Sequence, residues 1–352
     1  MRHLVLIISL TFLFLLAGCF GSSGTSVRLT EQESQIQHRE AEAAEALEKG
    51  MQLYHNGEFL DADAALVYFE EAVTLDPTLV GARYQRAMLY LEQNRLDEAL
   101  VDAEAALKLR PDYTKAQFTV GYISYRQGKY PTAIRAFTKT IKLDKNVSEA
   151  FAMRGSCYGN LGRYEEAISD YTKALAINPA HREAYYNRGI AHMHLGYHVR
   201  AAHDLTQAMT LDSQSLDTIL ARATAYTKLG QFDRAAADFN RAIVLTPTDS
   251  TLYGLLAEAH ASNGDFKAAE EASSRAFHIA KAQGDDAAAH VYEDMANSYA
   301  AQAAAAPPRS KSKAKTKSKA KAGVVPKPED EPGKPVEPKL ESDLPPEPVP
   351  SQ

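Results

Sequence analysis

Small and apolar residues recur along this chain with a period of 34 residues. Alanine occupies six positions at that spacing, and glycine keeps the same period at five others. These positions are Ala99, Ala133, Ala167, Ala201, Ala235 and Ala269, and Gly128, Gly162, Gly196, Gly230 and Gly264. Between them the apolar residues fall at the spacing of helices that bury one side. A period of this length predicts a repeat architecture of stacked helices, which offers an extended surface instead of a catalytic cleft.

The unit over residues 148–181 shows the pattern most clearly. Its two predicted helices cross where Gly155 and Ala167 lie, because only small side chains allow two helix backbones to approach closely. The larger Tyr158 and Tyr171 are expected to fill the space between neighbouring units. The same unit therefore carries both the contact within a helix pair and the contact between pairs.

The ends of both helices are also marked in this unit. Gly162 is expected to end the first helix because glycine accepts the left-handed backbone of a C-cap. Pro179 ends the second because it has no N–H to continue the helix. With Phe151 and Tyr164 at their characteristic places, the unit closely resembles the tetratricopeptide repeat.

The resemblance implies an all-α fold, a right-handed α-solenoid of about seven tetratricopeptide helix pairs over residues 30–284. The units are expected at about 43–79, 80–113, 114–147, 148–181, 182–215, 216–249 and 250–284. A capping box at Thr30 predicts that the first helix begins near that residue. About three residues are inserted between Gly57 and Ala65, and Asn94 replaces the usual helix-ending glycine. No strands are expected.

Residues 285–305 are expected to form a C-terminal capping helix, because a solenoid needs a solubilising end. Its predicted packing side consists of His290, Tyr292, Met295 and Tyr299.

The first 18 residues have the pattern of a secretory signal peptide. A basic start precedes the apolar run Leu4–Leu16, which is too short to span a bilayer comfortably. The following Leu16–Cys19 resembles a bacterial lipobox, which implies acylation (palmitate) of Cys19 and a flexible tether over 19–29. By the same resemblance, Phe20 in place of Asp implies the outer membrane, facing the periplasm. An ordinary signal peptide with a chance cysteine, or an uncut membrane anchor, remains an alternative.

Residues 306–352 form a different kind of segment. Eleven of the 16 prolines fall here, and no helical period continues. Cations occupy every second position over 309–321, and residues 326–352 mix proline with Glu and Asp. Too little apolar surface is present to offset the entropy of ordering, so we expect a disordered tail with polyproline character in its second part. The basic run is compatible with a solvated linker, anionic lipid or an envelope polymer; no nucleic acid partner is expected for an exported protein.

The remaining chemistry argues against catalysis. The usual phosphate-binding, zinc-protease and serine-hydrolase motifs are missing from the sequence, so we predict no enzyme activity and no cofactor. Cys157 has no partner once Cys19 is acylated, and we expect a buried inert thiol. Most carboxylates are expected on solvated helix faces. Four histidines form a weaker alternative as a metal site: His192, His194, His198 and His203.

Function is expected on the concave face. There the side chains of the first helix of each repeat differ from one repeat to the next, whereas the packing residues recur. In this family such residues line a groove for partner peptides or helices. The predicted groove residues are Tyr84, Met88, Leu91, Phe118, Tyr122, Tyr125, Arg126, Asn160, Tyr186, Asn187, Ile190 and Met193, beside Ala152 and Ser156. The alternative is that they contact each other, the first helix or the tail. The Lys and Asn set of a chaperone-tail clamp is lacking.

These features predict a non-catalytic scaffold or adaptor for protein–protein interaction, anchored in the bacterial cell envelope. The resemblance implies a role in pilus, secretion or envelope assembly. A regulatory or accessory subunit of a cell-wall or secretion enzyme is the alternative. The formal charge of −6 counts the signal and the tail, so it does not define the groove.

Overall fold

The computed structural model describes residues 23–55 and 58–305 and shows fifteen helices in this part of the chain. They fall into two compact units, one ending at Ala116 and one beginning at Gln117. The predicted signal peptide, Cys19 and the tail lie outside the described residues. No helix among the described residues is both long enough and apolar enough to cross a membrane.

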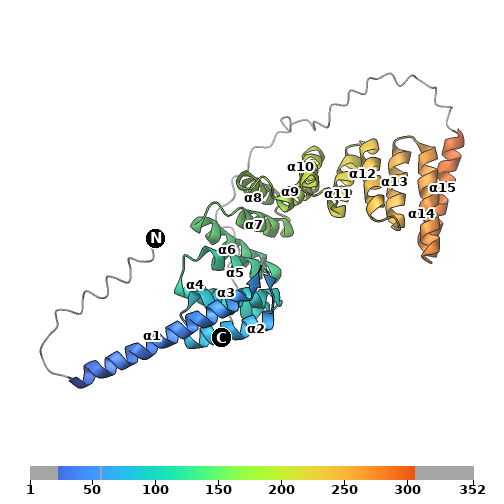
Figure 1. The fold of residues 1–352 in the computed structure, drawn as a ribbon. Coiled ribbons are helices and arrows are strands. Elements are labelled where there is room, and N and C mark those ends of the chain that lie inside the picture. Colours follow the sequence, from blue (N-terminus) through green and yellow to red (C-terminus); the bar gives the residue numbers. More distant parts are fainter. Residues whose placement is uncertain (1–22, 56–57, 306–352) are drawn as a thin grey trace, which may run out of the picture. The chain divides into compact units, whose positions relative to one another are not determined.

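The first unit contains α1 (Ser23–Gln52), α2 (Ala62–Leu75), α3 (Val80–Glu92) and α4 (Leu96–Leu109), each packed on the next. Since α1 already begins at Ser23, the predicted start near Thr30 is wrong, and Ser23 and Gly24 are helical instead of part of a tether. Residues 30–42 of α1 are all exposed, and burial begins only at Ala43. Figure 1 shows this part of α1 projecting from the other helices of its unit.

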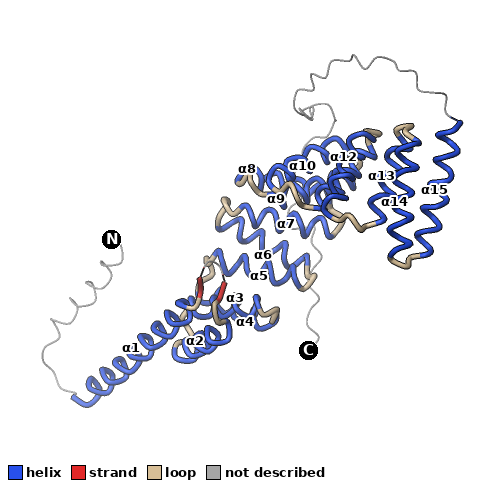
Figure 2. Tube along the Cα trace, turned by 45° about the vertical axis from the view of Figure 1, so that its right-hand side comes forward, coloured by secondary structure: helices blue, strands red, loops and turns tan. Residues whose placement is uncertain are grey.

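The insertion predicted in the first repeat forms a small hairpin. Strands β1 (Tyr54–His55) and β2 (Glu58–Phe59) pair antiparallel, and Figure 2 marks them in red between α1 and α2. The expectation of no strands is therefore wrong at this one place among the described residues. The extra residues leave the helix-pair packing intact, because α1 still contacts α2.

The boundary between the units falls within α5 (Thr114–Arg126), and the second unit continues the same pattern. Its helices follow in order and each stands beside the next (Figure 1). They are α6 (Tyr130–Leu143), α7 (Ser148–Asn160), α8 (Tyr164–Ile177), α9 (Arg182–His194), α10 (His198–Leu211), α11 (Leu216–Lys228), α12 (Phe232–Leu245), α13 (Ser250–Ser262), α14 (Phe266–Ala282) and α15 (Asp286–Ala305). An all-α helical-repeat solenoid is confirmed.

Helix ends and helix crossings follow the sequence closely. Gly162 has φ +72°, and Asn94, which replaces glycine, has φ 60°. A Cβ on Gly155 would lie 3.0 Å from the Tyr171 ring, so the glycine is required by close packing within the helix pair. Tyr171 thus fills space inside its own unit instead of between units.

The capping helix α15 packs with only part of its predicted side. Tyr292 contacts Gly254, and Met295 and Tyr299 lie against a core cluster of buried residues from α10 to α14. His290 is 82% exposed in its side chain, so its assignment to the packing side is wrong.

A ladder of buried ion pairs holds the helix pairs together. In four repeats an arginine of the first helix forms a bidentate contact with an aspartate 16 residues later, at 2.6–2.9 Å. The pairs are Arg86–Asp102, Arg154–Asp170, Arg188–Asp204 and Arg222–Asp238. Each aspartate is at most 3% exposed, so the expectation of solvated carboxylates is wrong for these four.

The same arginines join successive repeats in the second unit. Arg154 donates to Thr138 Oγ1 of the preceding repeat at 2.9 Å, and Arg188 and Arg222 make the equivalent bond. One guanidinium therefore ties three helices. Repeats that lack the arginine also lack the aspartate: Val120 and Ala136 occupy these places in the third repeat, and Leu256 and Ala272 in the seventh.

Candidate functional site: a pocket lined by tyrosines and amides

A pocket of about 220 Å³ opens between repeats four and five of the second unit. Its walls come from α5, α7, α8 and α9, and the residues are Tyr125, Ser156, Gly159, Asn160, Tyr164, Tyr171, Asn187, Ile190, Ala191 and His194. Five of these are residues predicted for the groove: Tyr125, Ser156, Asn160, Asn187 and Ile190. The volume is smaller than the roughly 300–1,000 Å³ of typical small-molecule sites, so the pocket suits a side chain or a short piece of peptide.

The hollow exists because repeat four has small residues where its neighbours have large ones. Gly159 stands at the position that holds Tyr125 one repeat earlier and Met193 one repeat later. Ser156 is likewise flanked in register by larger residues. A Cβ on Gly159 would meet nothing closer than the Tyr171 hydroxyl at 4.0 Å, so the space beside this helix is open.

Hydrogen bonds hold the floor of the pocket in place. Ser156 Oγ donates to the carbonyl of Ala152 at 3.1 Å, which leaves the Tyr171 hydroxyl, also 3.1 Å away, as the donor to Ser156. Asn160 Nδ2 donates to the Ser156 carbonyl at 2.8 Å, and the Tyr130 hydroxyl donates to Asn160 Oδ1 at 3.3 Å. These bonds fix the orientation of the polar atoms before any ligand arrives.

Hydroxyl and amide groups supply most of the polar lining of the pocket, beside the imidazole of His194. None of its lining residues is Lys, Arg, Asp or Glu. Burial raises the pKa of Tyr171 and of Tyr125, so both hydroxyls stay protonated. Asn187 makes no side-chain hydrogen bond within the described part of the chain, so its amide is available as both donor and acceptor. The site can bind a neutral polar or apolar group but holds no paired nucleophile and base.

One wall is an aromatic stack. The rings of Tyr164 and His194 are 4.4 Å apart and only 3° from parallel, which links the start of α8 to the end of α9. Tyr164 and His194 were not included among the predicted groove residues, although His194 directly follows the predicted groove residue Met193.

The other predicted groove residues are placed differently. Tyr84, Met88 and Leu91 belong to the first unit; Leu91 is buried at 9% exposure, so the structure contradicts its place on a groove surface. Tyr84 packs against Tyr113 with ring centroids 5.0 Å apart. In the second unit the remaining residues pack partly into core clusters or lie at their edge: Phe118, Tyr122, Arg126, Tyr186 and Met193.

The four histidines do not gather into a metal site. Among the described residues no group of three potential metal ligands is found. His192 is 6% exposed, His194 stacks on Tyr164, and His203 Nδ1 lies 3.5 Å from Asp204. His192 also lies near Asp204, with Nε2 3.7 Å from Oδ2.

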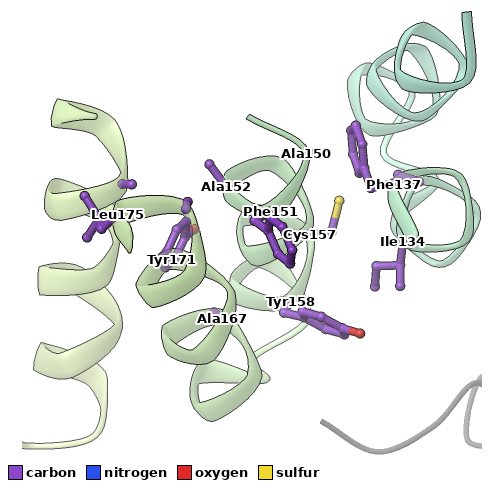
Figure 3. Close-up of a cluster of buried hydrophobic side chains, with 13 residues drawn as sticks. Ile134, Phe137, Ala150, Phe151, Ala152, Cys157, Tyr158, Ala167, Tyr171 and Leu175 are labelled. Carbon is purple, nitrogen blue, oxygen red and sulfur yellow. The ribbon is translucent and has the colours of Figure 1, made fainter. Parts of the chain in front are cut away.

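Cys157 is fully buried in the core of repeats three to five. Figure 3 shows its sulfur pointing from α7 toward Phe137 on α6. Burial raises the pKa of this thiol to about 12, which leaves almost no reactive thiolate at neutral pH. The interpretation as an inert packing residue agrees with this placement.

The solenoid is similar to several solved structures. The C-terminal part of a TPR repeat-containing protein from Cytophaga hutchinsonii is 19% identical, with a TM-score of 0.53, and the match covers 62% of this chain and 90% of that one. The pilF protein of Pseudomonas aeruginosa is 15% identical with a TM-score of 0.50, and the match covers 62% of this chain and 98% of that one. MamA is 23% identical with a TM-score of 0.47, and the match covers 49% of this chain and 94% of that one. At these identities the likeness concerns the fold.

Two family profiles match the repeats themselves. The one described as tetratricopeptide repeat matches residues 84–148 and 220–287, and the one described as TPR repeat matches residues 155–196. A comparison with curated proteins finds no match. The 34-residue period, the helix pairs and these matched repeats agree, and the chain belongs to the tetratricopeptide repeat family.

Proposed function

We propose that this chain is a non-catalytic adaptor of the bacterial cell envelope and that its second unit binds an extended segment of a partner protein. Tetratricopeptide repeats are in general scaffolds for protein interaction. The observation that carries the proposal is the pocket beside Gly159, which is preorganised, lined without Lys, Arg, Asp or Glu, and bordered by Asn187 with its free amide. A peptide backbone offers one donor and one acceptor per residue, which a primary amide can satisfy together.

Filling the pocket tests this function. Gly159→Met places in repeat four the residue that repeat five carries as Met193, and its Cβ would meet no atom closer than the Tyr171 hydroxyl at 4.0 Å. We expect partner capture by crosslinking in native envelopes to fall at least tenfold, because the side chain occupies the binding space. Thermal stability should not fall, since glycine is a poor helix former.

Ala261→Met is the matched control, because Ala261 holds the same repeat position two repeats beyond Met193 and lies away from the pocket. It should capture the same partners as the unaltered chain. Asn187→Ala should weaken capture by about five- to thirtyfold without filling the space, the effect of leaving a buried peptide group unpaired. Equal capture by all variants would contradict a role for the pocket.

Attachment to the envelope rests on the lipobox-like Leu16–Cys19. Two or three acyl chains at Cys19 form a stable anchor, since each buried methylene contributes about 0.8 kcal/mol. The exposed residues 30–42 of α1 would then hold the repeats away from the bilayer by about 20 Å. Phe20 favours the outer membrane.

Labelling with palmitate tests the anchor. Cells that express the full chain should incorporate labelled palmitate into it, and Cys19→Ser should abolish the label and release the protein from the membrane fraction. Label that persists in Cys19→Ser, or a wild-type chain without label, rules out this mode of attachment.

A further inference from the structure

The pocket has the chemistry that recognises a proline-rich strand. Tyr125 and Tyr164 contribute aromatic rings to its wall, and the hydroxyls of Ser156 and Tyr171 lie beside the amides of Asn160 and Asn187. A polyproline II segment makes no internal hydrogen bonds, so its carbonyls need external donors while its rings pack on aromatic faces. Such a segment loses little entropy on binding because it is already extended.

This chain carries a segment of that kind outside the described residues. Residues 344–350 read Leu-Pro-Pro-Glu-Pro-Val-Pro, with four prolines, two aliphatic residues and a single charge. The pocket, whose lining contains no Lys, Arg, Asp or Glu, suits such a segment. It does not suit the lysine run over 309–321, because burying an ammonium without a carboxylate partner is unfavourable.

We infer that the segment 344–350 lies across the pocket between α7 and α9 in the free protein, with one of its residues inserted, and that a partner segment must displace it. This inference rests on the proposed peptide-binding function and adds its regulation: the tail acts as a built-in competitor. A partner that carries a similar proline-rich segment would bind by exchange.

The tail is long enough to reach. From the end of α15 at Ala305 to Leu344 the chain can extend about 130 Å at most. Six helix steps separate α9 from α15, and at 8–10 Å each they amount to at most about 60 Å. A tethered segment also acts at an effective concentration of the order of millimolar, so even weak intrinsic affinity keeps the pocket covered.

A competition experiment on the full chain tests the inference. The probe is a fluorescein-labelled peptide of residues 342–352, followed by fluorescence anisotropy, with Cys19→Ser in every protein to prevent acylation. The chain with its own tail is compared with a tail variant in which Pro345, Pro346, Pro348 and Pro350 are replaced by Ser. The tail variant should bind the probe at least tenfold more tightly, because its own competitor is lost.

Adding Gly159→Met to the tail variant should abolish probe binding, whereas adding Ala261→Met should leave it unchanged; Asn187→Ala provides a second pocket variant. Equal probe affinity with native and altered tails overturns the inference, as does binding that Gly159→Met does not affect. Partner capture by the tail variant separates the two proposals. If partner capture still depends on Gly159 but the probe does not bind, the tail is not the occupant of the pocket. The proposed partner site is then still supported.

Discussion

Asp170→Ala lowers the free energy of unfolding by about 3–5 kcal/mol, the range for a buried ion pair that loses one partner. Asp170 is 1% exposed, and its two oxygens accept from Arg154 at 2.7 and 2.9 Å. Burial opposes the charge on Arg154, but the hydrogen bond and charge of Asp170 outweigh it and raise the pKa of the guanidinium. Without Asp170 that charge stays buried and unpaired.

Arg154→Leu combined with Asp170→Ala should recover most of this loss. The chain itself contains the apolar version of this contact, because Leu256 and Ala272 occupy the equivalent places in repeat seven. We expect the double variant to lie within about 1.5 kcal/mol of the unaltered protein, as well-packed apolar replacements of buried pairs do.

The measurement is urea unfolding followed by circular dichroism for both single variants, the double variant and the control Glu165→Ala. Glu165 is exposed, so its replacement should change stability by no more than about 0.5 kcal/mol. A double variant as unstable as the sum of the two single variants would show that the pair does not act as a unit.

Acidification from pH 8 to pH 5 should cost the protein about 2 kcal/mol through His192 alone. Burial lowers the pKa of His192 to about 4, with Asp204 opposing and Arg188 and Arg200 adding to the shift. The unfolded chain takes up the proton near pH 6.5 while the native state does not. Stability from this group is therefore complete above pH 6.5 and is lost as the pH falls toward 4, by about 3 kcal/mol in total.

His192→Tyr isolates this effect. Tyrosine holds the equivalent position in other repeats, at Tyr158 and Tyr226, so the ring is expected to fit. Other groups also titrate: the Glu149 carboxylate, 3.0 Å from the ring, raises the pKa of His181, and Asp204 has a lowered pKa. His181 and Asp204 are retained in the variant, so the difference between the two unfolding curves reports His192 together with its interaction with Asp204.

The two proteins should have similar pH dependence above pH 7 and diverge below 6.5, with His192→Tyr the more acid-stable. Urea midpoints at half-unit intervals from pH 8 to 4.5 measure this. Parallel curves over the whole range would mean that His192 takes up its proton at the same pH in the folded and unfolded states, which would contradict the prediction.

Much of the fold was predictable because the residues that make each type of contact recur in several repeats of the sequence. The recurrence of Gly162 at its position predicted the left-handed helix end, and Asn94 was correctly read as its substitute. The arginine and aspartate of each ion pair also recur in the sequence, 16 residues apart in four repeats. They were nevertheless expected on the solvated surface, because charged side chains are usually exposed. The start of α1 was misplaced because a capping box also occurs inside helices.

The candidate site was only partly predictable. The sequence located the concave positions of Tyr125, Asn160, Asn187 and Ile190, but it did not distinguish lining residues from packed ones such as Phe118. Figure 3 and the pocket geometry explain why: Tyr171 serves the core with its ring and the pocket with its hydroxyl. A tyrosine can therefore pack in the core and line the pocket at the same time, so the residue type does not reveal which of these roles it has.

By itself the sequence determined the class of fold, the helix pairs and their ends, because these depend on local backbone preferences and on side-chain size repeated every 34 residues. Only the tertiary structure decided where the pocket lies. A hollow forms where a small residue faces larger ones from other helices, as Gly159 faces Tyr125, Tyr171 and Ile190. The empty space of the pocket depends on how side chains from several helices pack together, so it cannot be predicted from any single position in the chain.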